Sequence, residues 1–526
     1  MRVWFSGRMT AFQAVDESSI LSTRTVKGRN LLAKMIRSFK NKIPEPVSQI
    51  TSTLKKANFE AFLVGGCVRD LLLNKTPKDW DITTNATPEQ IISLFPNTFY
   101  ENKFGTVGVV NKEVTDETLK IVEVTPYRSE SGYADNRHPD QVVFEKDIKE
   151  DLKRRDFTIN AMAYDVETKI VVDIFGGEND LEHKLINTVG NPDDRFMEDA
   201  LRMVRAIRLS GQLGFEIEEE TLASIKKNRE LLKNISKERI RDELIKILIS
   251  EDPKKSLFIA KESKIMAYII AELEETYDVA QNKAHSFNVF EHLLRSMQYA
   301  AHKGHVLEVR LAALLHDIGK PRSKRWSETT GEPTFYGHDV IGARMTEKIL
   351  ERLKFPRKTI DDVVRLVRWH MFFSDTEKIT MSAVRRLIAN VGKEYIWDLV
   401  NLRICDRVGT GRPKETPYRL RKFNAMIDEA LTAPVSVGML KIGGREVIAA
   451  IEAQPSPRIG FILHALLEEV LEDPTLNTKE YLEKRAKELN MLTDEELKKA
   501  GDSGKEKKEL EEEKKVSEIR KKHWVQ

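Results

Sequence analysis

The sequence predicts a multidomain protein in which an α+β head is followed by all-α domains. Three observations favour this fold class. The chain has 526 residues, which corresponds to roughly three to four domains of ordinary size. From Ala61 to Ile174, short apolar runs that end at turn residues alternate with helical segments. After Pro192, apolar residues recur at three-to-four spacing almost to the end of the chain, which is typical of helices.

In the predicted head we expect strands at residues 61–64, 79–82, 106–110 and 120–124, and helices at 68–73 and 88–95. Segments 157–164 and 169–174 complete the head, and the polar segment 132–139 is expected to be a mobile loop.

The helical part is expected to contain helices at 196–213, 221–227, 240–249 and 257–262. A second helical block runs from 285 to about 411, and two prolines mark a boundary at 412–417. Further helices are expected at 419–430 and 445–471. The Lys/Glu-rich residues from Asp494 onward carry no assigned chemistry.

The composition excludes several classes of protein. Apolar residues make up 40% of the chain and charged residues 32%, and no apolar run approaches the roughly 18 residues of a membrane span. The net charge is +3, from 86 basic and 83 acidic residues, so a nucleic-acid partner would need a local basic surface. The two cysteines, Cys67 and Cys405, exclude a disulfide framework and predict a reducing compartment, the cytoplasm.

The N-terminal residues contain no apolar signal-peptide core. Residues 17–22 (ESSILS) can be encoded by GAG-AGT-TCG-ATT-CTC-TCT, a stem of about five pairs around a TTCGATT loop, like the T-arm of a tRNA gene. Our hypothesis is that residues 1–34 translate an upstream tRNA gene and that the protein starts at Met35. A disordered extension is the alternative.

A diglycine and two carboxylates form the first functional motif. Asp79 and Asp81 are two residues apart, so on a strand both side chains point to one face and can hold a hard divalent cation. Gly65 and Gly66 precede a helix start, where the backbone can approach a phosphate closely. Arg69, in the first turn of that helix, can also meet a phosphate. Taken singly, Asp79 and Asp81 could be a solvated pair of carboxylates, and Gly65 and Gly66 could be a simple turn.

The stretch LVGGCVRDLLLNKTPKDWDI resembles the active-site motif of the polymerase-β-like nucleotidyltransferases, specifically the bacterial-type (class II) CCA-adding and poly(A) polymerases. Two more motifs of this family follow in order, RRDFTINA at residues 154–161 and EDxxR at residues 198–202. The resemblance covers roughly residues 62–213. It implies addition of C and A to the 3′ end of tRNA from CTP and ATP, with pyrophosphate release and without a nucleic-acid template.

The resemblance also implies roles for individual residues. A primer 3′-hydroxyl would attack the α-phosphate, assisted by two Mg²⁺ ions roughly 4 Å apart. Asp79 and Asp81 are the expected ligands. Glu123 is the candidate third catalytic carboxylate, and the alternative for it is an ordinary strand-edge charge. Arg69 and Arg155 are expected to hold the triphosphate by charge-assisted hydrogen bonds.

Base choice follows from hydrogen-bond chemistry. Asp199 can only accept and Arg202 can only donate, which matches the amino group and ring nitrogen that cytosine and adenine share. Uracil and guanine reverse this order, and each unsatisfied buried group costs about 1–3 kcal/mol. Arg205 and Arg208 follow at three-residue spacing on the same predicted helix and suit phosphate or ribose. A solvated basic helix face is the alternative.

By resemblance, residues 130–139 would act as a flexible lever between C addition and A addition. Enzymes that add only CC lack this lever. Its presence therefore favours CCA addition or A addition, without separating the two.

A second set of residues predicts a transition-metal site. His316 and Asp317 follow an apolar helix expected to end at Gly319, and imidazole with carboxylate suits Mn²⁺, Ni²⁺, Fe²⁺ or Zn²⁺. The order of residue types resembles the HD phosphohydrolase superfamily. The implied ligands are His292, His316, Asp317 and Asp406 of the single-metal pattern, and His338 and His370 of two-metal members.

The HD resemblance implies hydrolysis of phosphomonoesters or 2′,3′-cyclic phosphates by metal-bound water, which could trim damaged tRNA ends. A domain that keeps metal mainly for structure is the alternative. His285 and His464 fit no pattern.

These assignments predict six regions. They are an extension at 1–34, a nucleotidyltransferase head at 35–187, an RNA- and nucleotide-binding helical neck and body at 188–284, an HD domain at 285–411, a helical C-terminal region at 412–495 and a charged tail at 496–526. The expected partners are tRNA, CTP and ATP, with no membrane.

The sequence leaves three alternative functions. They are a poly(A) polymerase or A-adding enzyme, a nucleotide-sensing HD phosphohydrolase whose head only binds ligand, and a non-catalytic RNA-binding module. Intact Asp79 and Asp81 count against the sensor.

Overall fold

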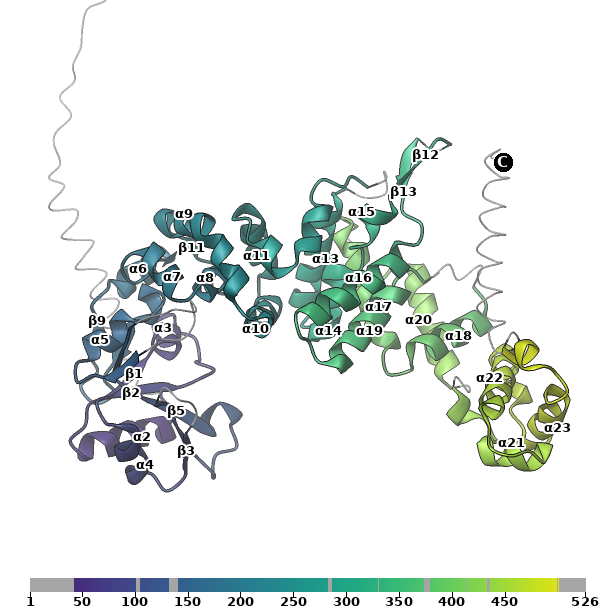
Figure 1. The fold of residues 1–526 in the computed structure, drawn as a ribbon, viewed down its shortest axis with the longest axis horizontal. Coiled ribbons are helices and arrows are strands. Elements are labelled where there is room, and N and C mark those ends of the chain that lie inside the picture. Colours follow the sequence, from purple (N-terminus) through teal and green to yellow (C-terminus); the bar gives the residue numbers. More distant parts are fainter. Residues whose placement is uncertain are drawn as a thin grey trace, which may run out of the picture. The chain divides into compact units, whose positions relative to one another are not determined.

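The structure is a computed structural model that describes residues 42–100, 105–131, 141–281, 286–329, 331–372, 379–412, 414–432, 436–498 and 500. It contains two compact units, which divide between Ile235 and Ser236 (Figure 1). The predicted extension at 1–34, the loop at 132–139 and the tail from 501 onward lie outside the described residues.

The first unit is built on a seven-stranded mixed sheet with the order β3-β4-β5-β2-β1-β8-β9. Its strands are β1 (Ala61–Val64), β2 (Asp81–Thr84), β3 (Thr98–Tyr100), β4 (Val107–Val110), β5 (Ile121–Pro126), β8 (Met162–Tyr164) and β9 (Val171–Asp173). Neighbouring strands are antiparallel except β2 and β5, which run parallel and pair Asp81 with Glu123 in register. The register therefore brings two acidic residues side by side.

Helices surround this sheet. They are α2 (Glu45–Lys56), α3 (Gly66–Leu72), α4 (Pro88–Leu94), α5 (Ile148–Lys153), α6 (Gly177–His183), α7 (Pro192–Glu198), α8 (Leu201–Leu213) and α9 (Glu219–Asn228). Two small pairings complete the unit, the hairpin β6 (Arg128–Ser131) and β7 (Gln141–Phe144), and the parallel pair β10 (Leu185–Ile186) and β11 (Glu216–Ile217). Val64, Leu152 and Ala163 are buried together and join β1, α5 and β8 into one core.

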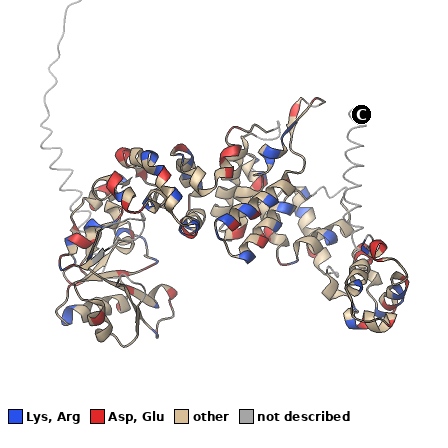
Figure 2. Ribbon diagram, viewed as in Figure 1, with Lys and Arg blue, Asp and Glu red and all other residues tan. Residues whose placement is uncertain are grey.

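The second unit is almost wholly helical. Its helices are α10 (Lys237–Leu248), α11 (Pro253–Glu262), α12 (Met266–Ile269), α13 (Val289–His302), α14 (Leu307–Leu315), α15 (Lys320–Ser323), α16 (His338–Arg352), α17 (Arg357–Trp369), α18 (Met381–Val391), α19 (Ile396–Gly409), α20 (Tyr418–Leu431), α21 (Gly444–Ile451), α22 (Pro457–Glu472) and α23 (Lys479–Leu489). Helices α13, α14 and α19 pack on one another, and α16 packs on α17. Figure 2 shows that positive and negative side chains are interspersed over these helices.

The predicted fold class, an α+β head followed by a helical region, is confirmed. The helical region also contains a short antiparallel hairpin, β12 (Arg325–Ser327) and β13 (Glu332–Thr334), that was not predicted. In the parts of the chain that the structure describes, no helix combines the length and apolar character needed to cross a membrane.

Most predicted elements differ from the structure by a few residues in their bounds, and three differences affect the motifs or divide a helix. The strand expected at 79–82 begins at Asp81. The helix expected at 196–213 is two helices, because Asp199 is extended (φ −145°) and its carboxylate accepts a hydrogen bond from the Leu201 amide at the start of α8. The helix expected at 445–471 is also two helices, because Glu452 is left-handed (φ 51°) and Pro457 starts α22.

Candidate functional site

The turn after β1 brings three functional groups together. Gly65 has φ 80°, and a Cβ there would lie 3.1 Å from Arg155 Nη1 and 3.6 Å from Asp81 Oδ2. A side chain at this position would be strained, would crowd Arg155 and would contact Asp81. Glycine therefore brings bare backbone next to a carboxylate and a guanidinium, directly before the N-terminus of α3.

Of the two aspartates of the DxD motif, Asp81 begins β2 and Asp79 lies in a bend just before the strand. Asp79 is exposed, Trp80 is buried at 3% exposure and Asp81 is half-buried. Glu123 on β5 is the register neighbour of Asp81. Among the described residues, oxygen atoms from all three do not lie within 4.8 Å of one another. The structure thus places Asp81 and Glu123 side by side on neighbouring strands, with Asp79 two residues before Asp81.

The two predicted phosphate-binding arginines have different environments. Arg69 is buried and donates to Asn160 Oδ1 at 2.7 Å and to Asp70 Oδ1 at 2.8 Å. Arg155 Nη2 donates to Asp151 Oδ2 at 3.1 Å, while its Nε is buried and has no hydrogen-bond partner within the described ranges. Arg155 therefore has donor capacity left at the Gly65 turn.

Asp156 connects the RRDFTINA motif to helix α8. Its carboxylate accepts from the Phe157 amide at 2.9 Å and from Asn160 Nδ2 at 3.2 Å, and it pairs with Arg205 Nη2 at 2.6 Å. Burial alone would raise the pKa of Asp156, but Arg205, Arg202 and these hydrogen bonds lower it to about 2. Asp156 thus fixes Arg205 in place, and through Asn160 it also supports Arg69.

The predicted base-reading residues lie where α7 ends and α8 begins. Arg202 is buried and donates to Glu198 Oε2 at 2.6 Å and to the Arg154 carbonyl oxygen at 3.0 Å. Arg208, two turns along α8, donates to Gln212 Oε1 at 2.7 Å. Asp199 lies in the break between α7 and α8, whereas Arg202, Arg205 and Arg208 lie on α8. The four residues therefore do not form the continuous helical stripe that the sequence predicted.

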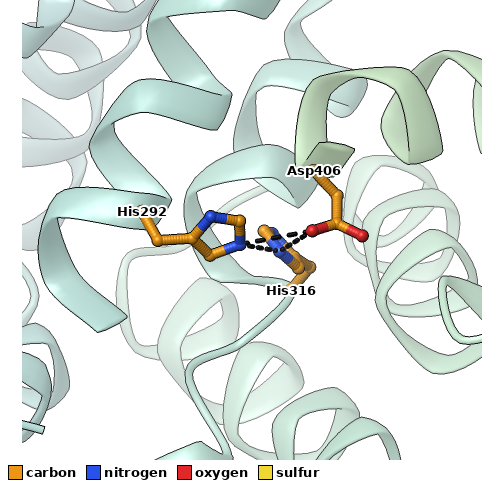
Figure 3. Close-up of side chains that lie close together, drawn as sticks. All are labelled: His292, His316 and Asp406. Atoms are coloured by element: carbon orange, nitrogen blue, oxygen red, sulfur yellow. Dashed lines mark hydrogen bonds and ion pairs between the residues drawn. The ribbon is translucent and has the colours of Figure 1, made fainter. Parts of the chain in front are cut away.

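The second unit brings all six predicted HD ligands into one buried cluster. His292 projects from α13, His316 and Asp317 follow α14, His338 starts α16, His370 follows α17 and Asp406 lies on α19. All six are at most 8% exposed. Figure 3 shows His292, His316 and Asp406 pointing toward one another from three elements.

The cluster consists of two donor groups. His292, His316 and Asp406 form one group, and Asp317, His338 and His370 form the other. Asp317 also connects the two groups, because its Oδ2 lies 3.2 Å from His292 Nε2 while its Oδ1 lies 3.2 Å from His338 Nε2. A carboxylate that faces two imidazole groups with separate oxygens is suited to bridge two cations.

The spacing of the donor atoms fits metal ions. In the first group, His316 Nε2 lies 3.0 Å from His292 Nε2 and 3.7 Å from Asp406 Oδ1. In the second, His338 Nε2 lies 3.2 Å from His370 Nε2. Ligands about 2.0–2.2 Å from a single ion stand about 3.0–3.6 Å from each other in tetrahedral or octahedral arrangement. Both groups therefore match the size of a first-row divalent metal site.

Hydrogen bonds to the backbone orient the imidazoles for metal binding. Nδ1 of His338 lies 2.7 Å from the Phe335 carbonyl oxygen, and Nδ1 of His370 lies 2.6 Å from that of Val367. Since a carbonyl oxygen only accepts, each Nδ1 carries a proton and donates it to the backbone. The two Nε2 atoms then face each other and the Asp317 carboxylate, an arrangement that suits a bound metal ion.

Charge also shapes this cluster. Burial alone would lower the pKa of His292, but its hydrogen bonds to Asp317 and Asp406 raise it to about 9. The pKa of Asp317 lies well below its usual value despite burial, because Lys320 and the histidines face it. The pKa of Asp406 is also well below its usual value despite burial, because His292, His316 and Arg403 face it. Asp317 and Asp406 are therefore ionised and available as ligands.

Close backbone packing holds the second unit's cluster together. A Cβ at Gly319 would lie 2.3 Å from the His338 carbonyl oxygen, so only glycine lets the chain after Asp317 approach the start of α16. The sequence predicted a helix that ends at Gly319, but α14 ends at Leu315 and a turn covers residues 316–319. The reason for glycine there is tertiary.

Some residues that support the sites were not predicted from sequence. Lys320 Nζ pairs with Asp317 Oδ2 at 2.6 Å, and Arg403 Nη1 pairs with Asp406 Oδ2 at 2.6 Å. Their spacing of three residues from the aspartates was the available signal. Asn160 and Glu198 stood inside recognised motifs but had no assigned role. His285 lies outside the described residues, and His464 is exposed on α22.

Three protein-family models match the chain. Residues 61–187 match the poly A polymerase head domain, residues 214–276 the probable RNA and SrmB-binding site of polymerase A, and residues 289–408 the HD domain. The matches follow one another along the chain in the predicted order of head, RNA-binding region and HD domain.

Similar curated proteins include the CCA-adding enzymes of Lactobacillus helveticus and Lactobacillus johnsonii. The first is 46% identical over 217 residues, covering 41% of this chain and 53% of the relative, and the second is 47% identical over 223 residues, covering 42% and 54%. The chain spans about half the length of these curated relatives. The solved structure of the Bacillus stearothermophilus CCA-adding enzyme in complex with CTP is 27% identical, with a TM-score of 0.64 over 85% of this chain and 98% of that chain.

Proposed function

Since the chain matches the poly A polymerase head domain at residues 61–187 and an HD domain at residues 289–408, we propose that it adds C and A to the 3′ end of tRNA. CTP and ATP would be the substrates and pyrophosphate the by-product. The observation that carries this proposal is the grouping of Gly65, Asp81 and Arg155, which suits a triphosphate beside a metal-binding carboxylate. The CCA-adding relatives support the choice of C and A.

Asp79, Asp81 and Glu123 would hold Mg²⁺, which prefers oxygen ligands. Bound Mg²⁺ would activate the primer hydroxyl and neutralise charge on the leaving pyrophosphate. Arg155 and Arg69 would hold the triphosphate so that the α-phosphorus faces the primer 3′ oxygen. The new bond joins that oxygen to the α-phosphorus, and the bond from the α-phosphorus to the oxygen that bridges to the β-phosphate breaks.

Asp199 and Arg202 would select the base, and Arg205 and Arg208 would contact phosphate or ribose. Arg202 donates to Glu198 in this structure, so facing a base requires it to exchange that bond for one to the nucleotide. The free-energy cost of breaking the hydrogen bond to Glu198 is small when Arg202 gains a hydrogen bond to an acceptor on the base in its place. A base that offers a donor instead would leave Arg202 unsatisfied.

The tRNA would be recognised by shape and backbone phosphates, and binding would weaken with salt. The proposed regions are a head at 35–187, an RNA-binding neck and body at 188–284, an HD domain at 285–411 and a helical region at 412–495. A lever at residues 130–139 and a cytoplasmic location remain predictions.

For the HD domain we propose metal-dependent phosphohydrolase activity. The two donor groups joined by Asp317 support two divalent transition metals such as Mn²⁺, Ni²⁺, Fe²⁺ or Zn²⁺. The bound metals would supply an activated water and neutralise phosphate charge. A phosphomonoester or 2′,3′-cyclic phosphate at an RNA end is the substrate expected from the sequence.

The test of the main proposal is a tRNA transcript that lacks CCA. With CTP alone we expect addition of C, and with CTP and ATP together we expect CCA. Incorporation of AMP but no CMP would favour a poly(A) polymerase or an A-adding enzyme. Hydrolysis of nucleotides without any extension would favour the nucleotide-sensing phosphohydrolase.

A further inference from the structure

One buried carboxylate of the first unit lies outside the predicted site residues. Asp151 is on α5, just before the RRDFTINA motif, and it is completely buried. Its Oδ1 accepts from Arg154 Nη2 at 2.7 Å and from Arg154 Nε at 3.1 Å. Its Oδ2 accepts from Arg155 Nη2 at 3.1 Å. Each oxygen of this carboxylate therefore holds a different guanidinium group.

The end of α5 brings both arginines back to Asp151. The helix ends at Lys153 and Arg154 caps it, so the two arginines follow Asp151 at three- and four-residue spacing, where side chains meet on a helical turn. Pairs of this spacing on a surface contribute little, because water competes for both charges. Asp151 is shielded from water, so the loss of one partner would leave a buried charge unbalanced.

The carboxyl group of Asp151 is ionised at neutral pH. Burial alone would raise its pKa, but the charges of Arg155 and Arg154 and their hydrogen bonds lower it. The carboxylate therefore accepts from both guanidinium groups under the conditions in which nucleotides bind.

Pairing with Asp151 fixes the direction of the Arg155 guanidinium. Nη2 bonds to Asp151, while Nη1 lies at the turn after β1, 3.1 Å from the place of a Cβ on Gly65. A guanidinium is planar and presents its donors in a rigid fork, so fixing one nitrogen also fixes the direction of the other. Nη1 therefore lies where the proposed function places the triphosphate.

Asp81 is a competing partner for this guanidinium. Its Oδ2 lies 3.6 Å from the same Cβ position on Gly65. Without Asp151, Arg155 would be attracted to the carboxylate of Asp81, which the proposed reaction needs for Mg²⁺. Asp151 thus turns Arg155 toward phosphate and holds it away from a metal ligand.

We propose that Asp151 is a positioning residue for nucleotidyl transfer, which holds the Arg155 guanidinium toward the triphosphate at the Gly65 turn. This inference rests on the proposed function and adds to it a residue that does not itself touch the substrate. The alternative is an ion pair that only fastens the end of α5. The two differ in one respect, because a positioning residue acts through Arg155 and has no effect on the substrate once Arg155 is removed.

The test is a double-mutant cycle on the full chain with Mg²⁺, which measures Kd for CTP by calorimetry and KM for CTP with a tRNA lacking CCA. Asp151→Asn keeps the size of the side chain but replaces one accepting oxygen with an amino group that only donates. We expect Kd and KM to rise about tenfold or more in Asp151→Asn, but less than about threefold when Arg155→Ala is already present.

Two comparisons show that the effect concerns the phosphates. KM for ATP should rise by the same factor as KM for CTP, since the two nucleotides share the triphosphate. The inhibition constant of inorganic tripolyphosphate should rise in parallel, because this ion carries the phosphates without a base. Glu150→Gln is the matched control and should leave all three values unchanged, because it removes a half-exposed carboxylate that pairs with Lys153 on the same helix.

Additive effects of Asp151→Asn and Arg155→Ala would overturn the proposal, as would an unchanged inhibition constant for tripolyphosphate. If Asp151→Asn shows no cooperative thermal unfolding, Arg155→Lys decides instead. Lysine keeps the charge, but one ammonium group cannot bond to Asp151 and face the Gly65 turn in the way that two guanidinium nitrogens do. Arg155→Lys should therefore lose as much CTP affinity as Arg155→Ala, and wild-type affinity would overturn the proposal.

The same measurements separate this inference from the proposed function. A wild type that binds CTP but does not extend tRNA would refute the addition of C and A, whereas the coupling of Asp151 and Arg155 in CTP binding would still decide the role of Asp151. A wild type that binds no CTP would overturn both.

Discussion

Replacing Asp156 with asparagine tests whether the charge of this buried carboxylate organises the first unit. Asparagine keeps the size of the side chain and an oxygen that can accept from the Phe157 amide, but it removes the ion pair with Arg205. The pKa of Asp156 is lowered from 3.8 to about 2. At about 1.4 kcal/mol per unit, the charge contributes about 2 kcal/mol to the free energy of unfolding.

This contribution depends on pH in a defined direction. Because the folded pKa lies below the unfolded pKa, the stabilisation is complete above about pH 4 and is lost as the pH falls through about 2. The wild type should therefore be more stable than Asp156→Asn by about 2 kcal/mol at neutral pH, and the difference should vanish near pH 2. For a unit of this size the neutral-pH difference corresponds to about 4–8 °C in Tm.

The assay is urea unfolding of the full chain, with pulse hydrogen exchange read by mass spectrometry on peptides from β1 and β8. These strands report on the first unit alone. Glu113→Gln, at an exposed carboxyl in the same unit, is the control and should change stability by less than about 0.5 kcal/mol. A difference for Asp156→Asn that persists near pH 2, or that is below about 0.5 kcal/mol at neutral pH, would refute the reasoning.

Three further predictions concern the two sites. Gly65→Ala should lower nucleotide incorporation at least about tenfold, because the new Cβ would contact Arg155 and Asp81. Gly176→Ala is the control: Gly176 has φ 76° and open space around it, so the change should cost about 1 kcal/mol of stability and leave incorporation intact. Equal losses of incorporation in the two variants would contradict the prediction. Elemental analysis should show that His338→Ala lowers the bound divalent metal from two ions to one per chain. His464→Ala, which changes an exposed histidine on α22, is the control and should keep two ions. Two ions retained by His338→Ala would count against the dinuclear site. Chelation of metal from the second unit should lower the melting temperature of the wild type more than that of His338→Ala, since ions that bind only the folded state stabilise it; equal shifts would show that the metals do not contribute to folding.

Local sequence signals predicted the first unit's central elements well. The strand expected at residues 61–64 is β1 with the same bounds, because an apolar run that ends in two glycines has only one good local solution. The break at Asp199 escaped prediction because the apolar spacing continues through it. There a side-chain hydrogen bond to the backbone, which spacing does not reveal, ends one helix and starts another.

Tertiary placement limited the prediction of the sites more than residue type did. The six HD ligands could be named because their order along the chain resembled a known family, and the structure brings them together. The cavity beside this cluster could not be predicted, because its lining residues Lys320 and Arg419 are about a hundred residues apart and carry no motif that connects them. β12 and β13 were missed because three-residue strands are too short to show an alternating pattern.

The most direct measurement of the central claim is sequencing of the 3′ ends of a tRNA lacking CCA after incubation with CTP, ATP and Mg²⁺. The wild type and His316→Ala, which alters only the second unit, should both yield CCA ends, whereas Asp81→Asn should lower extension by at least about a thousandfold. CCA ends produced at the wild-type rate by Asp81→Asn would contradict the assignment of the nucleotidyl-transfer site to the turn of Gly65 and the strand that begins at Asp81.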